Sequence, residues 1–504
     1  MFKTWDDAML RLGLLASAAL CWYSASRLWE AGNSVIERGS LAFALIGYFL
    51  AALMLFMAVI RSIPRWARLL IPLTLILMWA SLLQINTVNR DQAGRAFTTD
   101  VHLFSDYAAT LVRHGENPYT YDMLDAYRVY RTSELYSTPL INGDIVGGVS
   151  YPSLAFLIYV PFQALGIDTT LIYPLMLLAT LLLIYWLAPP ALRPLAVLPF
   201  LVNPNYALYS LGGVNDIGWA LLLCLMIAAW KRMGWRAVIF GLACAFKQQP
   251  WFLAPFLLIR LWYEADGQPV RARLWTLAKF GLIAAGVFLA LNVPYIVANF
   301  NAWLGGILRP LTQDMIILGQ GYSSLSLFGV VFLPDWVFSL LTYGLLISLL
   351  ALYARYYRHW PDTLWIFPAI MLWFGRRSLS SYWYYYLFPL AAALLIQIRH
   401  NLPAPVVEAE AEKLPASRLW LVPVVIGALA SIGAFAFAAI PNPIQISLVG
   451  PVLYGGTDTR LTVRVENKSS QPLTPRFSVE SWGEQPAFWD VLAGASVLQA
   501  GESG

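Results

Sequence analysis

Residues 41–60 read LAFALIGYFLAALMLFMAVI, a stretch of twenty residues without a charged side chain. A membrane-spanning helix needs about 20 consecutive apolar residues, so this stretch predicts a transmembrane helix. Of the 504 residues, 59% are hydrophobic and only 12% are charged, whereas an average soluble domain is about 25% charged. With a mean hydropathy of +0.62, the sequence predicts an all-α polytopic protein embedded in a lipid bilayer.

Further apolar runs on both sides of this stretch predict roughly 10–13 membrane helices in total. The runs cover residues 9–28, 40–60, 67–88, 151–166, 169–187, 194–210, 217–230, 237–262, 275–298, 325–354, 363–398 and 419–440. Run 151–166 is predicted to be re-entrant, and runs 169–187 and 194–210 to cross the membrane. Runs 237–262 and 363–398 contain charges, and each is predicted to be a pair of short helices that meet at its charged residues.

Basic residues gather in five loops between these runs, and the positive-inside tendency makes such loops cytoplasmic. They are Arg61, Arg65 and Arg68; Lys231, Arg232 and Arg236; Arg271, Arg273 and Lys279; Arg355 and Arg358; and Arg399, Lys413 and Arg418. The long loop 89–150 contains Asp and Glu but no lysine, and is therefore expected to be extracytoplasmic.

The domain organisation follows from these segments. Residues 1–402 form the transmembrane domain, 403–417 a cytoplasmic linker, and 418–440 the last transmembrane helix. In 441–504 the stretches IQISLVG and RLTVRVEN alternate like strands, which predicts a small β-rich extracytoplasmic segment. A truncated immunoglobulin-like domain is one interpretation of it.

Three groups of polar residues are candidates for chemistry. Asp100, in the outer loop, is placed to act as a general base at the membrane surface, although a helix cap or a solvated acid would look the same. We expect Thr98, Thr99 and Arg95 to favour its ionised form. Asn215 and Asp216 follow two glycines, and either cap a helix or bind substrate hydroxyls.

The third group is cationic and comprises Lys247, Arg376 and Arg377, all inside apolar runs. Charges in such segments are costly and face a cavity or a partner. They are predicted to bind a lipid-linked phosphate; ion pairing and snorkelling are the alternatives. The chain has 21 Trp, 26 Tyr and 26 Phe residues, with a dense run at 382–386, YWYYY. Most of these aromatic residues are expected to lie in interfacial belts, with sugar stacking as the other interpretation.

Other classes are disfavoured. The formal charge of +5 comes without the basic patch of a nucleic-acid binder, so no nucleic-acid partner is expected. No Gly-rich phosphate loop, zinc-protease motif or kinase signature occurs. The sequence therefore predicts no soluble nucleotide-using active site and no cofactor; it shows no cluster of metal ligands and leaves metal dependence open.

The motifs in residues 70–400 resemble the GT-C superfamily of membrane glycosyltransferases, and most closely glycosyltransferase family 87, which includes polyprenol-phosphate-mannose-dependent mannosyltransferases. The similar positions are Asp100, Phe104, Ala108, Ala109, Gly115, Asn117, Pro118 and Tyr119; Tyr151-Pro152-Ser153 and Pro161; Asn203-Pro204 and Gly213-Val-Asn215-Asp216; Gly241-Leu-Ala-Cys-Ala-Phe-Lys247; and Gly321-Tyr-Ser323-Ser-Leu325. The sequence lacks the glutamine of the family's Gly-Gln pattern and the Asn-Gln before Ser323.

The resemblance implies an inverting transfer of a mannose-like hexose from a polyprenyl-phosphate sugar donor to a glycan or glycolipid acceptor. Asp100 would be the base, and Lys247, Arg376 and Arg377 would bind the donor phosphate. Asn215, Asp216, Asp106, Tyr119 and Ser323 are expected to contact substrate. The expected location is a bacterial plasma membrane, with the site on the extracytoplasmic side. A secondary transporter or lipid-sugar flippase is the main alternative, and a non-catalytic scaffold for the β segment is another.

Overall fold

The computed structural model describes residues 5–35, 38–60, 62–93, 97, 99–132, 137–201, 203–328, 330–331, 333–401, 421–438, 442–450, 453–455, 458–477 and 489–504. The fold is mostly helical, as predicted. Expectations that fall on Arg95, Thr98 and the linker 403–417 lie outside the described residues.

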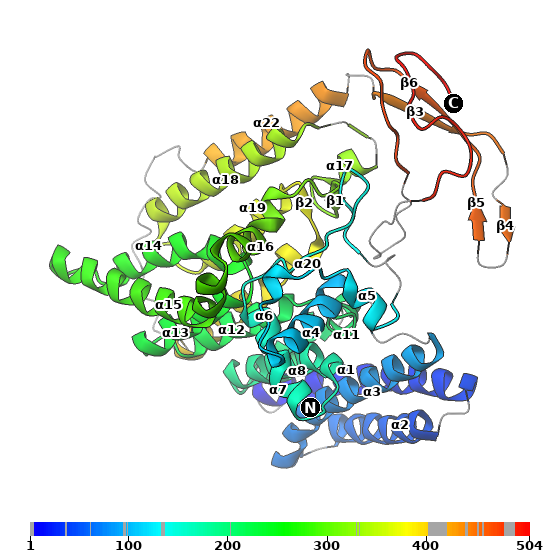
Figure 1. The fold of residues 1–504 in the computed structure, drawn as a ribbon. Coiled ribbons are helices and arrows are strands. Elements are labelled where there is room, and N and C mark those ends of the chain that lie inside the picture. The colour runs from blue at the N-terminus through cyan, green and yellow to red at the C-terminus, as the bar shows by residue number, and fades with distance from the viewer. Residues whose placement is uncertain are drawn as a thin grey trace.

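The first three predicted runs form long helices that pack together, blue in Figure 1: α1 (Trp5–Val35), α2 (Arg38–Val59) and α3 (Leu70–Ala93). Gly47 allows α1 and α2 to approach closely, since a Cβ there would lie 2.9 Å from the Cβ of Ala25. Arg11 donates hydrogen bonds to the carbonyls of Ala58 and Ile60, each at 2.8 Å. These carbonyls lie where α2 ends and lack helical partners, so the buried arginine joins the two helices.

The centre of the molecule is a bundle in which α8 (Ile172–Leu187) packs on α12 (Asp216–Ala228), α12 on α13 (Met233–Phe246), and α13 on α15 (Val270–Ala298). α21 (Leu387–Asn401) contacts both α8 and α12. Large side chains are fully buried in this core, among them Trp219, Trp365 and Phe246. On the opposite side from α2, α18 (Asp335–Tyr356) and α22 (Leu421–Ala438) lie side by side (Figure 1).

Both charge-interrupted runs break at their charges, as predicted. α13 ends at Phe246, Lys247 has an extended backbone, and the chain resumes as η5 (Gln249–Leu253) and α14 (Ala254–Glu264). Pro250 lies in the break, where its missing N–H prevents a continuous helix. The second run divides into the following elements: η6 (Thr363–Trp365), α19 (Phe367–Trp373), β2 (Arg377–Ser378), α20 (Ser380–Tyr384) and α21.

Residues 151–215 form one helix long and apolar enough to cross a membrane, Thr169–Leu187, as predicted for run 169–187, and otherwise short pieces. The elements are α6 (Leu154–Leu157), α7 (Tyr159–Ala164), η4 (Thr169–Leu171), α8, α9 (Arg193–Ala196), α10 (Leu198–Leu201) and α11 (Pro204–Leu211). α6 and α7 together rise about 16 Å, which is too short to span a bilayer. Residues 205–211 and α12 meet at a bend of 114°. The single crossing predicted over 194–210 is therefore wrong, because prolines at 194, 199 and 204 interrupt it.

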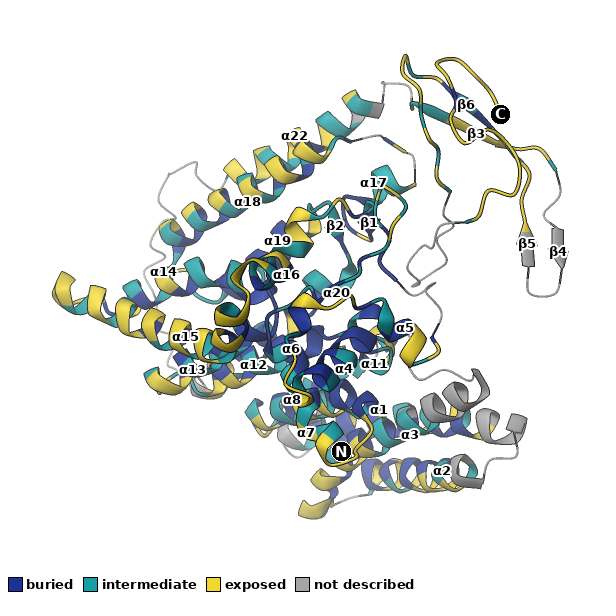
Figure 2. Cartoon of the chain, viewed as in Figure 1, coloured by how far each residue is buried: buried dark blue, intermediate teal, exposed yellow. Residues whose placement is uncertain are grey.

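Within the described residues, five helices are long and apolar enough to cross a membrane, or six if the bent pair counts as one span. The expectation of 10–13 membrane helices is not reached on these criteria, because several apolar runs fold into shorter helices. The long helices expose large apolar side chains, such as Leu282 on α15 and Ile347 on α18. Figure 2 shows exposed faces along α2, α15, α18 and α22, as expected for helices in contact with lipid.

The remaining short elements connect and surround the bundle. They are η1 (Arg65–Leu69), α4 (Asp100–Arg113), η2 (Pro118–Thr120), α5 (Asp125–Val129), α16 (Phe300–Thr312), β1 (Leu318–Gly319) and α17 (Ser324–Leu327). β1 pairs in parallel with β2, with Leu318 opposite Arg377. This pairing fixes the backbone next to the arginine pair.

The C-terminal segment contains the two predicted strands. β3 (Ile444–Leu448) pairs antiparallel with β6 (Val463–Asn467), and β4 (Leu453–Gly455) with β5 (Asp458–Arg460). These described strands form two separate two-stranded ladders, and the immunoglobulin-like interpretation stays a prediction. The helix predicted over 418–440 is α22. In Figure 1, β3 and β6 lie at the opposite end of the molecule from α13, α14 and α15.

Candidate functional site

The broken helices and the loop 89–150 line a cavity of about 1040 Å³. Six residues singled out by the sequence line it: Asp100, Asn215, Asp216, Lys247, Arg376 and Arg377. They come from segments far apart in the chain, so the fold collects them in one place. A cavity of this size accommodates a ligand as large as a sugar phosphate.

Asp100 is the first residue of α4 and is 5% exposed. Its Oδ1 accepts a hydrogen bond from the N–H of Val101 at 2.7 Å, and its Oδ2 accepts one from the hydroxyl of Thr138 at 2.6 Å. Burial raises the pKa of the Asp100 carboxyl above its ordinary value. The hydrogen bond from Thr138 and the positive charge of Arg377 act in the opposite direction. The carboxyl is thus buried, and the charge of Arg377 favours its ionised form.

This environment corrects two expectations about Asp100. Thr99 does not stabilise the carboxylate: its hydroxyl caps α4 by accepting from the N–H of His102 and donates to the carbonyl of Gly212 at 3.0 Å. The neighbourhood also does not favour ionisation overall, because desolvation outweighs the hydrogen bonds. An aspartate with a raised pKa is a stronger base than a solvated one once it is ionised.

Asp216 and Lys247 form a buried ion pair at the start of α12. The Nζ of Lys247 lies 2.8 Å from Asp216 Oδ1 and donates to Asn215 Oδ1 at 2.7 Å. The indole N–H of Trp219 donates to the same Asp216 oxygen at 2.8 Å. Of the alternatives considered for Lys247, the structure shows ion pairing, so its charge is already neutralised.

The same cluster corrects the helix-cap interpretation of Asn215. Its side chain makes no capping hydrogen bond to α12 and instead binds Lys247. Two buried polar atoms of these cavity-lining residues, Asn215 Nδ2 and Asp216 Oδ2, have no hydrogen-bond partner in the part of the chain that the structure describes. One is a donor and the other an acceptor, so together they suit a ligand hydroxyl pair.

Gly213 explains how the chain brings this cluster beside Asp100. It has a φ of +84°, and a Cβ there would lie 2.4 Å from Nδ1 of His102. Only glycine fits such a left-handed position pressed against another side chain. Because His102 lies on α4, the turn before α12 rests directly on the helix that begins with Asp100.

The arginine pair also lines the cavity, and its two members differ in their ion pairs. Arg376 Nε lies 3.1 Å from Asp335 Oδ1 and its Nη1 3.9 Å from Asp314, so its charge is paired, although its Nε and Nη2 make no hydrogen bond among the described residues. Among the described residues, Arg377 donates to the thioether of Met315, at 3.3 Å, and its buried Nε lacks a hydrogen-bond partner. A guanidinium with an unused donor facing a cavity suits an oxyanion.

Two of the charged side chains that line the cavity differ from the others in having no ion-pair partner among the described residues. Lys247 pairs with Asp216, and Arg376 with Asp335. Among the described residues, no ion pair involves either Asp100 or Arg377. The cavity therefore presents one carboxylate and one guanidinium that are not neutralised by direct pairing, and the charge of Arg377 acts to lower the pKa of the Asp100 carboxyl.

Three predicted substrate contacts do not line the cavity. Asp106 accepts a hydrogen bond from the hydroxyl of Tyr130. The hydroxyl of Tyr119 donates to the carbonyl of Tyr151 at 2.8 Å, and that of Ser323 to the carbonyl of Leu318 at 3.3 Å. Each supports the walls rather than facing the cavity.

Sequence reasoning missed or misread other residues here. Thr138 and Asp335 line the cavity, and nothing in the local sequence distinguishes either from an ordinary loop residue. The interfacial-belt interpretation of run 382–386 is wrong for its second half, since Tyr385 and Tyr386 are fully buried in the core. The ring of Tyr382 instead lies over the Nζ of Lys247, 5.3 Å from ring centroid to nitrogen.

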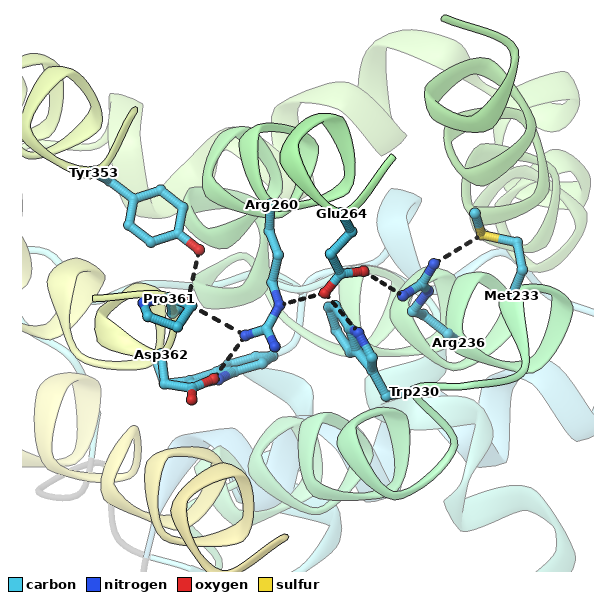
Figure 3. Close-up of polar contacts among 9 residues, drawn as sticks. Trp230, Met233, Arg236, Arg260, Glu264, Tyr353, Pro361 and Asp362 are labelled. Carbon is cyan, nitrogen blue, oxygen red and sulfur yellow. Dashed lines mark hydrogen bonds and ion pairs between the residues drawn. The ribbon is translucent and has the colours of Figure 1, made fainter. Parts of the chain in front are cut away.

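A second charged cluster lies away from the cavity, between α13, α14 and the segment before α19 (Figure 3). Arg260 bridges Glu264 at 2.9 Å and Asp362 at 2.7 Å. The indole N–H of Trp230 donates to Glu264 at 2.9 Å, and the Arg236 guanidinium also pairs with this glutamate. Every charge in the cluster has a partner, which identifies it as a structural network that holds the helices together.

No protein-family model matches the chain, and neither the curated proteins nor the solved structures searched contain a significant match. Within the described part of the chain, no three His, Cys, Asp or Glu side chains group as metal ligands.

Proposed function

We propose that the protein is a GT-C-like membrane glycosyltransferase that moves a hexose from a polyprenyl-phosphate donor to a glycan or glycolipid acceptor. The observation that carries the proposal is the pair Asp100 and Arg377, which line one cavity without direct ion-pair partners among the described residues. A base and an anion-binding group are the two elements that such a transfer requires.

In the proposed reaction, the oxygen of an acceptor hydroxyl attacks the anomeric carbon of the donor sugar. The bond from that carbon to the phosphate oxygen breaks, and polyprenyl phosphate leaves with the electron pair. Asp100 takes the proton of the acceptor hydroxyl, and Arg377 binds the phosphate oxygens as their charge grows. The attack on the face opposite the leaving group inverts the anomeric configuration, and no cofactor takes part in the proposed steps.

The remaining cavity residues receive supporting roles. The free Asn215 Nδ2 and Asp216 Oδ2 would bind sugar or acceptor hydroxyls, while Lys247 holds that pair in place. Arg376, which is paired with Asp335, would contribute less to phosphate binding than Arg377. We place the site on the extracytoplasmic face of a bacterial plasma membrane, because the basic loops would then be cytoplasmic.

The test is transfer by the purified protein in lipid nanodiscs, supplied with polyprenyl-phosphate sugars of defined headgroup. The measured products are free polyprenyl phosphate and glycosylated acceptor. Arg377→Gln is expected to raise the KM for the donor, and Arg376→Gln, as its matched control, to raise it less. Absence of product with every donor, or equal effects of the two substitutions, would contradict the proposal.

A transporter or flippase of a lipid-linked sugar is the second candidate. It is favoured by the 114° bend before α12 and by the break at Lys247, because transporters build substrate sites from discontinuous helices. Proteoliposomes distinguish the two functions: a transporter moves the intact lipid-linked sugar between leaflets, whereas the enzyme releases polyprenyl phosphate.

A further inference from the structure

Thr138 lies in the outer loop, 38 residues along the chain from Asp100, yet the two side chains meet inside the protein. The threonine hydroxyl is 2.6 Å from Asp100 Oδ2. The exposed fractions are 7% for Thr138 and 5% for Asp100, so little water competes for this bond. The main-chain N–H of Thr138 also bonds the carboxyl.

The segment that carries Thr138 is held firmly. It folds back on itself, with the N–H of Val146 bonded to the carbonyl of Thr138 at 2.9 Å. Two hydrogen bonds connect it to the chain around Met315. The N–H of Ile141 donates to the carbonyl of Asp314 at 2.8 Å, and the N–H of Ile316 donates to the carbonyl of Pro139 at 3.2 Å.

The chain around Met315 also contacts Arg377. Met315 accepts the hydrogen bond of Arg377 through its sulfur, and β1, three residues further on, pairs with the strand of Arg377. One folded strap, residues 138–146, therefore touches the carboxylate directly and the guanidinium through Met315. Its position sets the separation of the two groups.

We propose that Thr138 is the positioning residue for Asp100: its hydroxyl holds Oδ2 so that a lone pair of the ionised carboxylate faces the cavity. This inference rests on the proposed function. With Oδ1 held by Val101 and Oδ2 by Thr138, the carboxylate cannot turn, and a substrate hydroxyl meets a base of fixed orientation. Such preorganisation accelerates proton transfer because the geometry is set before the reaction.

The hydrogen bond also affects protonation. A hydroxyl that donates to a carboxylate binds the ionised form more strongly than the neutral form. The other groups that face Asp100 are the guanidinium of Arg377 and the phenol of Tyr151, with His102 two residues along α4. Across the cavity, Lys247 and Asp216 neutralise each other. Loss of the threonine hydroxyl therefore shifts Asp100 towards its protonated, inactive form.

The experiment compares Thr138→Val, Thr138→Ser and Thr180→Val in the full chain. Valine preserves the shape and the main-chain N–H of Thr138 but removes the hydroxyl, while serine restores the hydroxyl. Thr180, fully buried in α8 and bonded to the carbonyl of Met176 at 2.7 Å, controls for losing a buried threonine hydroxyl elsewhere. Protonation of Asp100 is followed by pH-difference infrared spectroscopy of its carboxyl C=O band, assigned by its loss in Asp100→Asn.

Thr138→Val is expected to move the titration midpoint of Asp100 upward and to lower kcat roughly tenfold or more, with the donor KM unchanged. Thr138→Ser and Thr180→Val are expected to titrate like the unmodified protein. An unchanged midpoint in Thr138→Val, or the same shift in Thr180→Val, overturns the inference. If the unmodified protein transfers no sugar, the proposed function fails, whereas the infrared titration still decides whether Thr138 controls Asp100.

Discussion

Replacing Lys247 with methionine removes the charge that neutralises Asp216 while keeping most of the side-chain volume. At the observed 2.8 Å, the attraction between the two charges is about 6 kcal/mol at an effective dielectric constant of about 20. The cost of burying both ions offsets much of it. What remains after the substitution is an unpaired carboxylate at a fully buried position, and such losses cost about 3–5 kcal/mol.

The double variant Lys247→Met with Asp216→Asn removes both charges together, so it should recover most of this loss. The assay is equilibrium unfolding in mixed micelles for the two single variants and the double variant. Lys279→Met, at an exposed lysine on α15, is the control and should change the unfolding free energy little. If Lys247→Met is as stable as the unmodified protein but binds donor weakly, then the lysine is a phosphate ligand, and the ion-pair reasoning is refuted.

Four further predictions follow from the site. Asp100→Asn should lower the rate of sugar transfer by about 10²–10⁴-fold. It should leave the thermal stability equal or higher, since it removes a buried charge. Asp106→Asn, which does not line the cavity, should lower the transfer rate less in the same assay. Burial raises the pKa of Asp100, and the base is active in its ionised form. In a pH–rate profile, kcat should therefore fall as the pH drops through a midpoint above the ordinary aspartate range. A midpoint in the ordinary range would contradict this. Gly213→Ala should lower the unfolding temperature, because its left-handed φ and the contact with α4 leave no room for a Cβ; an unchanged melting curve would refute the strain argument. Single cysteines at Glu116 and Arg65 should react with an impermeant thiol reagent from the outside and the inside, respectively; the reverse pattern would invert the topology.

The candidate residues show how much of the site could be predicted from the sequence. Asp100, Asn215, Asp216, Lys247, Arg376 and Arg377 were all identified from residue type and surroundings, and all line one cavity. Asp106, Tyr119 and Ser323 were identified in the same way and do not line it. A polar residue in an apolar segment indicates that its side chain has a polar partner. The sequence does not show whether that partner is a ligand or another group of the protein.

What the sequence determined by itself is the helical character and the places where helices break. Long apolar stretches such as 41–60 form helices, in which the backbone polar groups bond within the segment, as a lipid environment would require. Lys247 and the Arg376–Arg377 pair mark breaks, because a charge disfavours burial in a continuous apolar helix and Pro250 removes a backbone donor. The alternating strands β3 and β6 were visible for a similar local reason, their two-residue periodicity.

What only the tertiary structure decided is the pairing of the charges. Lys247 is neutralised by Asp216, 31 residues earlier, Arg376 by Asp335, and Asp100 is held by Thr138 from a distant loop. Each partner is selected by packing, since hydrogen bonds and ion pairs form only over about 3–4 Å and residues far apart in sequence reach that distance only after the helices have docked. The identity of Asp100 and Arg377 as the unneutralised pair is therefore a property of the fold.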